Sequence, residues 1–225
     1  MFNVALFAAF PYVAIVLAVT VGLLRYYRDR YSYSSQSSQF LENRTLFWGS
    51  VAWHYSILLI LSAHVLALLF PGAWGSLIAN QTRLYILEVT GLALALLTVL
   101  GLTLLIVRRI RFPRVFAVTT ILDWILLAAL LGQVALGFTV ALLYRWGSDW
   151  YLHTAVPWLV SLAVFDPKIS YVTVLPWLVK LHMLGGFLII ALFPFTRLVH
   201  LVTFPVTYLW RPYQVVIWNA RRTAR

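Results

Sequence analysis

The sequence has no cysteine, and only 10% of its 225 residues are charged. The absence of cysteine excludes disulfide bonds, iron–sulfur clusters held by thiolates, and c-type haem attached through a CxxCH motif. Acidic residues are also scarce, because 6 Asp and Glu stand against 17 Lys and Arg. No basic helix or aromatic platform is left outside the apolar runs, so the net charge of +11 does not indicate a nucleic-acid-binding protein.

Apolar residues make up 63% of the chain, and the mean hydropathy is +0.90. A soluble domain is nearer to about half apolar. Five runs reach the length of about 20 residues that crosses about 30 Å of hydrocarbon as a helix. We therefore predict an all-α integral membrane bundle, a single domain over residues 1–225, with spans at about 3–24, 46–70, 84–107, 121–143 and 176–200. The first run lacks a basic leader, so we expect a retained span rather than a signal peptide.

Basic residues are concentrated in alternate connections. Thirteen of the seventeen lie in the connections after the first and third spans or at the C-terminal end, and the other four are Arg83, Arg145, Lys168 and Lys180. Lys and Arg accumulate on the cytoplasmic side of a membrane protein, so we expect an outer N-terminus and a cytoplasmic tail over residues 201–225. The long outer loop, 144–175, contains Trp146, Trp150, Tyr151 and Trp158, which suit an aromatic belt at the membrane surface.

Four of the five histidines lie on the second and fifth spans. His54 and His64 are ten residues apart, or about 15 Å of helical rise, and His182 and His200 are eighteen apart, or about 27 Å. Ligands of one metal ion must lie within about 4 Å of each other, so each centre must take one histidine from each span. Antiparallel spans would pair His64 with His182 toward the outer side and His54 with His200 toward the cytoplasm. A kink at Pro194 would absorb the unequal spacings.

Two histidine-only pairs in an apolar setting favour two b-type haems with bis-histidine ligation. Zinc would require more ligands, and copper would lack a nearby Met or Cys. Gly185 and Gly186 would admit either a flat macrocycle or a close neighbouring helix. Arg197, one turn before His200, is a candidate partner for a haem propionate, with a snorkelling interfacial arginine as the alternative. A hydrogen-bonding role for single histidines and a proton-relay transporter are the competing interpretations.

Several stretches carry a resemblance that covers most of the chain. These are PYVAIVL, SSQFLENR, WHYSILLILSAHVLALLFP, FPRVFAVTTILD and LHMLGGFLIIALFPFTRLVHLVTFPVTYL. They resemble the gamma subunit of respiratory nitrate reductase, a di-haem cytochrome b anchor of the bacterial cytoplasmic membrane. The outer loop, 144–175, resembles the family least.

The resemblance implies that His64 and His182 bind a distal haem and that His54 and His200 bind a proximal haem. It further implies that menaquinol or ubiquinol is oxidised on the outer side, which contributes to the proton-motive force. Electrons would then pass to an iron–sulfur (beta) subunit and a molybdenum (alpha) subunit that reduces nitrate in the cytoplasm. The same electron wire serving a heterodisulfide- or sulfite-reductase-like complex is the alternative within this class, and a purely structural anchor is another.

The remaining charged residues carry weaker expectations. The family has a lysine near Arg83 that serves the quinol site, so Arg83 is a candidate for quinol contact or a plain interfacial anchor. Glu88 would accept a quinol proton or pair with Arg83. Asp123 would favour the dipole of its helix or form an ion pair or partner contact. We expect His153 at the surface, with proton release as the alternative, and the basic tail on the iron–sulfur subunit or on anionic lipid.

Overall fold

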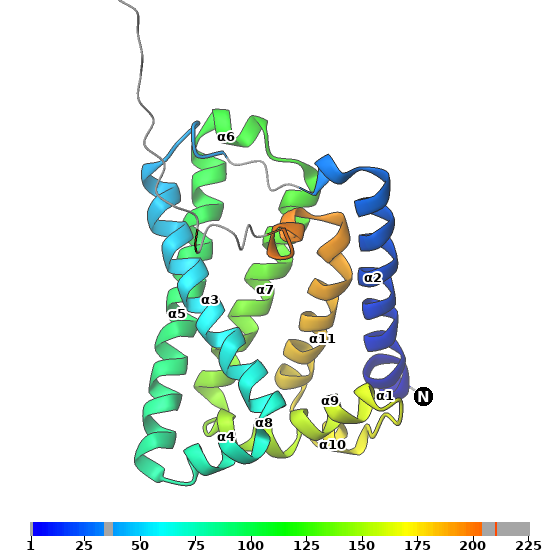
Figure 1. Cartoon of the computed structure of the whole chain (residues 1–225). Coiled ribbons are helices and arrows are strands. Elements are labelled where there is room, and N and C mark those ends of the chain that lie inside the picture. Colours follow the sequence, from blue (N-terminus) through cyan, green and yellow to red (C-terminus); the bar gives the residue numbers. More distant parts are fainter. Residues whose placement is uncertain (1, 34–37, 204–209, 211–225) are drawn as a thin grey trace, which may run out of the picture.

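The computed structural model describes residues 2–33, 38–203 and 210, which form a helical bundle without strands (Figure 1). Five helical segments are long and apolar enough to cross a membrane, which confirms the predicted all-α membrane class. They run over Phe2–Arg28, Arg44–Leu69, Gln81–Arg111, Ile121–Leu143 and Trp177–Phe195. The first comprises α1 (Phe2–Val4), the π-helical turn η1 (Ala5–Ala9) and α2 (Phe10–Arg28), and the next three are α3, α5 and α7.

The two ends of the bundle differ in their connections (Figure 1). One end, here called the loop-helix end, carries the short helices α4 (Pro71–Ile78), α8 (Gly147–His153), α9 (Ala155–Ala163) and α10 (Ser170–Thr173). The opposite end, here called the arginine-rich end, carries α6 (Pro113–Ala117) and the 3-10 turn η2 (Arg30–Ser32). It also holds Arg25, Arg28, Arg30, Arg44, Arg108, Arg109, Arg111, Arg114 and Arg197. The predicted orientation, with this end in the cytoplasm, rests on that asymmetry.

Helices α3 and α5 approach each other closely through small residues. A Cβ atom at Gly101 would lie only 2.6 Å from the backbone nitrogen of Trp53, so only glycine permits this approach. Between the same helices the buried hydroxyl of Thr98 donates to the hydroxyl oxygen of Ser56 over 2.7 Å. Small residues and paired hydroxyls hold helices together in a membrane, where apolar burial alone gives little preference.

The fifth span is shorter than predicted. Helix α11 covers Trp177–Leu192 and is followed by two 3-10 turns, η3 (Phe193–Phe195) and η4 (Arg197–Leu201). The break falls at Pro194, since proline lacks an N–H group and its ring collides with the carbonyl four residues earlier. His200 therefore lies on a 3-10 turn, and the expected helical rise of about 27 Å from His182 is wrong. The tail from residue 204 onward lies outside the described residues, apart from Trp210.

The predicted aromatic belt is wrong at one position. Trp158 is 1% exposed and lies in a core cluster with Phe7 and Phe187, which links α9 to η1 and α11. Its indole N–H donates to the carbonyl oxygen of Phe7 over 3.0 Å. Trp146 remains exposed, as expected for a belt residue. The loop 144–175 thus folds into short helices, one of which is anchored in the bundle.

Candidate functional site

His54 and His200 meet at the side of the bundle toward the arginine-rich end. His54 projects from α3 and His200 from η4, and their ring centroids lie 6.2 Å apart at an interplanar angle of 73°. Two metal–nitrogen bonds of about 2.0 Å each are compatible with this spacing. The fold thus brings together two residues that the sequence paired across 146 positions of chain.

All four span histidines have the same ring nitrogen bound to a backbone carbonyl. Nδ1 contacts the carbonyl oxygen of Ser50 at 2.8 Å in His54, of Ile60 at 2.8 Å in His64, of Gln133 at 3.2 Å in His182, and of Arg197 at 2.7 Å in His200. A carbonyl oxygen only accepts, so Nδ1 must carry the hydrogen. In a neutral imidazole, Nε2 then keeps a free lone pair, which is the tautomer that a metal ligand requires.

A centre with two protein ligands fits this arrangement better than a larger cluster. Within the described part of the chain, no group of three or more His, Asp or Glu residues is placed to hold a metal ion. In a b-type haem the iron takes only two ligands from the protein, because the porphyrin supplies the others. The residues present therefore fit the predicted cofactor class.

His182 is seated on the backbone of α7. Its ring lies so close to Gly137 that a Cβ atom there would be 2.8 Å from the ring carbon Cε1. The side chain of Gln133 donates to the carbonyl oxygen of His182 over 3.0 Å, and the carbonyl of Gln133 accepts from the ring. A Cβ atom at Gly185 would collide with the Gln133 side chain, which favours helix packing over macrocycle approach for that glycine. The predicted site did not include Gln133 or Gly137.

His64 contacts α8 at the loop-helix end through Tyr151. Its ring and that of Tyr151 are 5.1 Å apart, centroid to centroid, at 75°, and the Tyr151 hydroxyl donates to the His64 carbonyl oxygen over 3.3 Å. Burial raises the pKa of the Tyr151 phenol above its ordinary value. The pairing of His64 with His182 around one iron stays a prediction.

Arg197 and Asp123 form a bidentate ion pair. Arg197 Nε lies 2.6 Å from Asp123 Oδ1, and Nη2 lies 2.9 Å from Oδ2. Asp123 also forms a capping box with Thr120 at the start of α7, so both the helix-terminus and the ion-pair expectations hold for it. The propionate role of Arg197 stays a prediction, with two of its nitrogens directed at Asp123.

The quinol-site candidates lie at the loop-helix end but do not contact each other. Arg83 is exposed in the first turn of α5. Glu88 Oε1 accepts the backbone N–H of Ser148 over 3.0 Å and so holds α8 against α5. No ion pair joins Glu88 to Arg83 among the described residues. A cavity of about 260 Å³ at this end is lined by Gln81, Thr82, Tyr85 and Trp146, and Arg83 is not among its lining residues.

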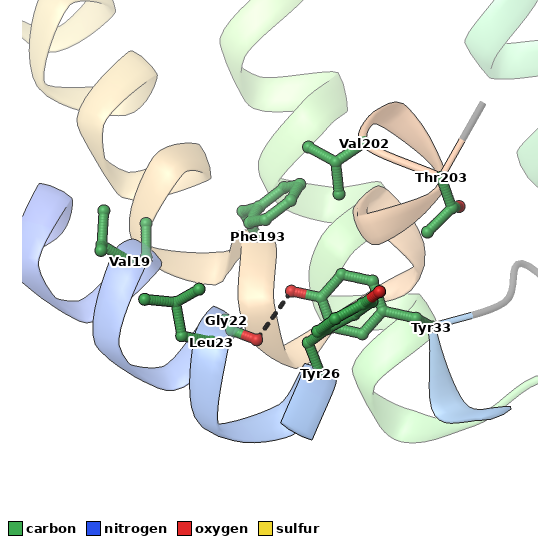
Figure 2. A pocket seen from close by; sticks show the side chains of 9 residues that line it. Val19, Gly22, Leu23, Tyr26, Tyr33, Phe193, Val202 and Thr203 are labelled. Atoms are coloured by element: carbon green, nitrogen blue, oxygen red, sulfur yellow. Dashed lines mark hydrogen bonds between the residues drawn. The ribbon is translucent and has the colours of Figure 1, made fainter. Parts of the chain in front are cut away.

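Two further features lie away from the histidine pairs. His153 is 70% exposed and 3.6 Å from Asp149, as expected for a surface residue. A cavity of about 370 Å³ lies between α2 and the chain after α11, where Phe193, Val202 and Thr203 line it (Figure 2). Tyr33 lines it and donates its hydroxyl to the carbonyl oxygen of Gly22 over 2.9 Å. None of the four span histidines lines this cavity.

Comparison with known proteins gives a consistent family. The family model described as nitrate reductase gamma subunit matches residues 3–219. The nitrate reductase gamma chain of Bacillus subtilis (strain 168) is 29% identical over 214 residues, covering 93% of this chain and 96% of that protein. The respiratory nitrate reductase 1 gamma chain of Escherichia coli (strain K12) is 31% identical over 220 residues, covering 95% and 96%. The nitrate reductase-like protein NarX of Mycobacterium tuberculosis is 33% identical over 221 residues, but this chain spans only 33% of its length.

Proposed function

The chain belongs to the nitrate reductase gamma subunit family, and from this premise we propose that it carries electrons across a bacterial cytoplasmic membrane through two b haems. One observation supports the proposal above all others. Each of the four span histidines donates Nδ1–H to a backbone carbonyl and keeps Nε2 for a ligand bond. Four histidines in one tautomer, three of them on spans and His200 on η4, are hard to explain as helix-packing residues.

His54 and His200 would hold one haem, and His64 and His182 would hold the other. The haem iron supplies reversible one-electron transfer when it is bound. The chain supplies the axial nitrogens, the carbonyl acceptors that fix each ring, and apolar helices that exclude water. The carbonyl at Nδ1 also raises the basicity of the ligating nitrogen, which affects the reduction potential.

The electron donor would be a membrane quinol at the loop-helix end. Its oxidation to quinone releases two electrons, which leave one at a time, and two protons, which leave toward the outer side. Arg83 would bind a quinol oxygen; its neighbour Thr82 lines the cavity that Tyr85 and Trp146 also line. Glu88 would act on this site by holding α8 in place, because its carboxylate already accepts from Ser148.

The electron acceptor would be a subunit docked on the arginine-rich end. The His54 and His200 pair lies toward this end, and the surrounding arginines favour a partner with an acidic surface. An iron–sulfur subunit there would pass the electrons to a molybdenum subunit that reduces nitrate. Quinol oxidation would thus take place on this chain and nitrate reduction on its partner.

Haem content tests the proposal. The membrane complex is purified with wild-type chain and with the variants His54→Ala and His64→Ala, and haem is counted by a pyridine haemochrome assay beside reduced-minus-oxidised spectra. We expect two b haems per wild-type chain and one per chain in each variant. Folded wild-type chain without b haem would refute the proposal and favour a histidine proton relay.

A further inference from the structure

The segment that carries His200 lacks the support of a regular helix. Helix α11 ends at Leu192, and His200 follows on η4, a 3-10 turn of five residues. Short 3-10 turns have poorer hydrogen-bond geometry than α-helices, so they hold a side chain less firmly. Contacts from other helices must therefore fix the position of this ring.

Two neighbouring helices provide such contacts. From α2, Arg25 Nη1 donates to the carbonyl oxygens of Pro194 and Thr196 over 2.7 and 3.4 Å. From α7, the Asp123 carboxylate binds the Arg197 guanidinium in the bidentate ion pair described above. The segment between α11 and His200 is thus held on both sides by charged groups.

Arg197 connects Asp123 on α7 to the ring of His200. The carbonyl oxygen of Arg197 accepts the Nδ1–H of His200 over 2.7 Å, so one residue binds Asp123 through its side chain and His200 through its backbone. Asp123 itself is 4% exposed and is fixed at the start of α7, where Oδ2 accepts the Thr120 N–H over 2.9 Å. A bidentate pair with a buried carboxylate is directional and strong.

We propose that Asp123 is a positioning residue for His200 and acts through Arg197. By fixing the Arg197 carbonyl, Asp123 sets the orientation of the His200 ring and the hydrogen bond at Nδ1. That hydrogen bond tunes a ligating histidine, so Asp123 influences the reduction potential of the haem held by His54 and His200. The inference rests on the proposed function, because it assumes that His200 is a haem ligand.

The test compares three variants in the purified membrane complex. Asp123→Asn keeps the side-chain volume and an acceptor for the Thr120 N–H but removes the charge. Asp123→Ala removes the contact, and Asp123→Arg combined with Arg197→Asp reverses the ion pair. Thr120→Val is the matched control, since it weakens the start of α7 and leaves the ion pair in place. The readouts are redox titration of each haem and the low-temperature electron paramagnetic resonance of the oxidised low-spin haems.

We expect Asp123→Asn and Asp123→Ala to shift the potential and the low-spin signal of one haem only. That haem is identified as the one absent from His54→Ala. Electron delivery through it should fall by about tenfold or more, as for other changes next to a metal ligand. The reversed pair should move both readouts back toward wild type, and Thr120→Val should leave them unchanged.

Three results would overturn the inference. Unchanged potentials and signals in assembled Asp123→Asn would do so, and that variant stays decisive even if Asp123→Ala does not accumulate. An equal shift in Thr120→Val would assign the effect to the helix start. Absence of haem from wild-type chain would instead refute the proposed function and this inference with it, so the two failures can be told apart.

Discussion

The two histidine pairs are supported in different ways. At the loop-helix end, His182 lies on an intact helix and is seated on α7 by uncharged contacts with Gln133 and Gly137. Toward the arginine-rich end, His200 lies beyond a proline break. Its segment is held by one ion pair, between Arg197 and Asp123, and by Arg25, which donates to backbone carbonyls. A ligand on a complete helix needs only shape and neutral hydrogen bonds. A ligand on a broken helix needs charged anchors, because its backbone lacks the helical hydrogen-bond ladder.

The largest expected effect comes from filling the seat of His182. Gly137→Ala places a methyl group 2.8 Å from the ring, so we expect the haem of His64 and His182 to be lost and the other to remain. The overpacking itself should cost about 1–3 kcal/mol of unfolding free energy. The matched control is Gly132→Ala on the same helix, where a Cβ atom meets nothing within 4 Å. Haem counting distinguishes them, and equal content in both variants would contradict the proposed seat.

The second effect concerns Arg25, which binds the backbone carbonyls after α11 at the arginine-rich end. Arg25→Ala removes the donors to Pro194 and Thr196, and hydrogen bonds to a charged group contribute about 1.5–3 kcal/mol. We expect a lower unfolding temperature in detergent and weaker retention of the haem of His54 and His200 only. Arg28→Ala, an exposed arginine on the same helix, should have little effect. Loss of the haem of His64 and His182 instead would show that Arg25 stabilises the bundle as a whole.

A smaller effect should follow from the tyrosine over His64. Tyr151→Phe keeps the ring contact and removes the hydrogen bond to the His64 carbonyl, which should cost about 0.5–1.5 kcal/mol of unfolding free energy. Redox titration should then show a small shift confined to the haem of His64 and His182. Tyr171→Phe serves as the control, since Tyr171 is an exposed tyrosine on α10. A shift in the haem of His54 and His200 would contradict the assignment.

Acid should weaken the ion pair at the arginine-rich end in which Arg108 Nε lies 2.6 Å from Glu42 Oε2, with a small effect on stability. Burial would raise the pKa of the Glu42 carboxyl, but the Thr45 N–H, the Arg108 guanidinium and the Leu46 N–H outweigh it and hold the pKa below the ordinary value of 4.5. A group with a depressed folded pKa stabilises the fold fully above its unfolded pKa. That stability is lost as the pH falls through the folded pKa.

Thermal unfolding at pH values from about 6 to 3 measures this loss, because that range begins above the ordinary carboxyl pKa and ends below it. Glu42→Gln should show a shallower decline than wild type because it has no carboxyl to protonate. Asp166→Asn removes an exposed carboxylate that lies 3.7 Å from Lys168 and should follow the wild-type curve. Parallel curves for wild type and Glu42→Gln would show that this ion pair does not set the acid response.

The sequence was sufficient to predict the features that depend on local pattern. Apolar runs predicted the five spans, and the missing N–H of Pro194 indicated where the last helix would be disturbed. The residue pattern also predicts that His54 and His200 lie close together, and their rings are 6.2 Å apart, centroid to centroid. The resemblance of the long motifs to the family is confirmed by the family match over most of the chain.

Features that depend on contacts between distant segments could not be predicted. Gln133 and Gly137, one turn apart in an apolar span, form the contact surface for His182. The local sequence indicates a polar and a small residue there, but it does not show which histidine they face. The sequence around Trp158 predicts a surface residue, whereas its indole N–H donates to the carbonyl oxygen of Phe7, 151 residues earlier in the chain. The predicted propionate role of Arg197 depends only on its sequence separation from His200, whereas its carboxylate partner, Asp123, lies 74 residues earlier in the chain.

The pairing of the histidines across the two segments is the central claim, and two double variants test it directly. His54→Ala with His200→Ala removes both ligands of one proposed haem, so one b haem per chain should remain. His54→Ala with His182→Ala removes one ligand from each haem, so none should remain. The count is made by pyridine haemochrome on purified, assembled complex. The reverse result, with a haem kept only in the second variant, would contradict the pairing.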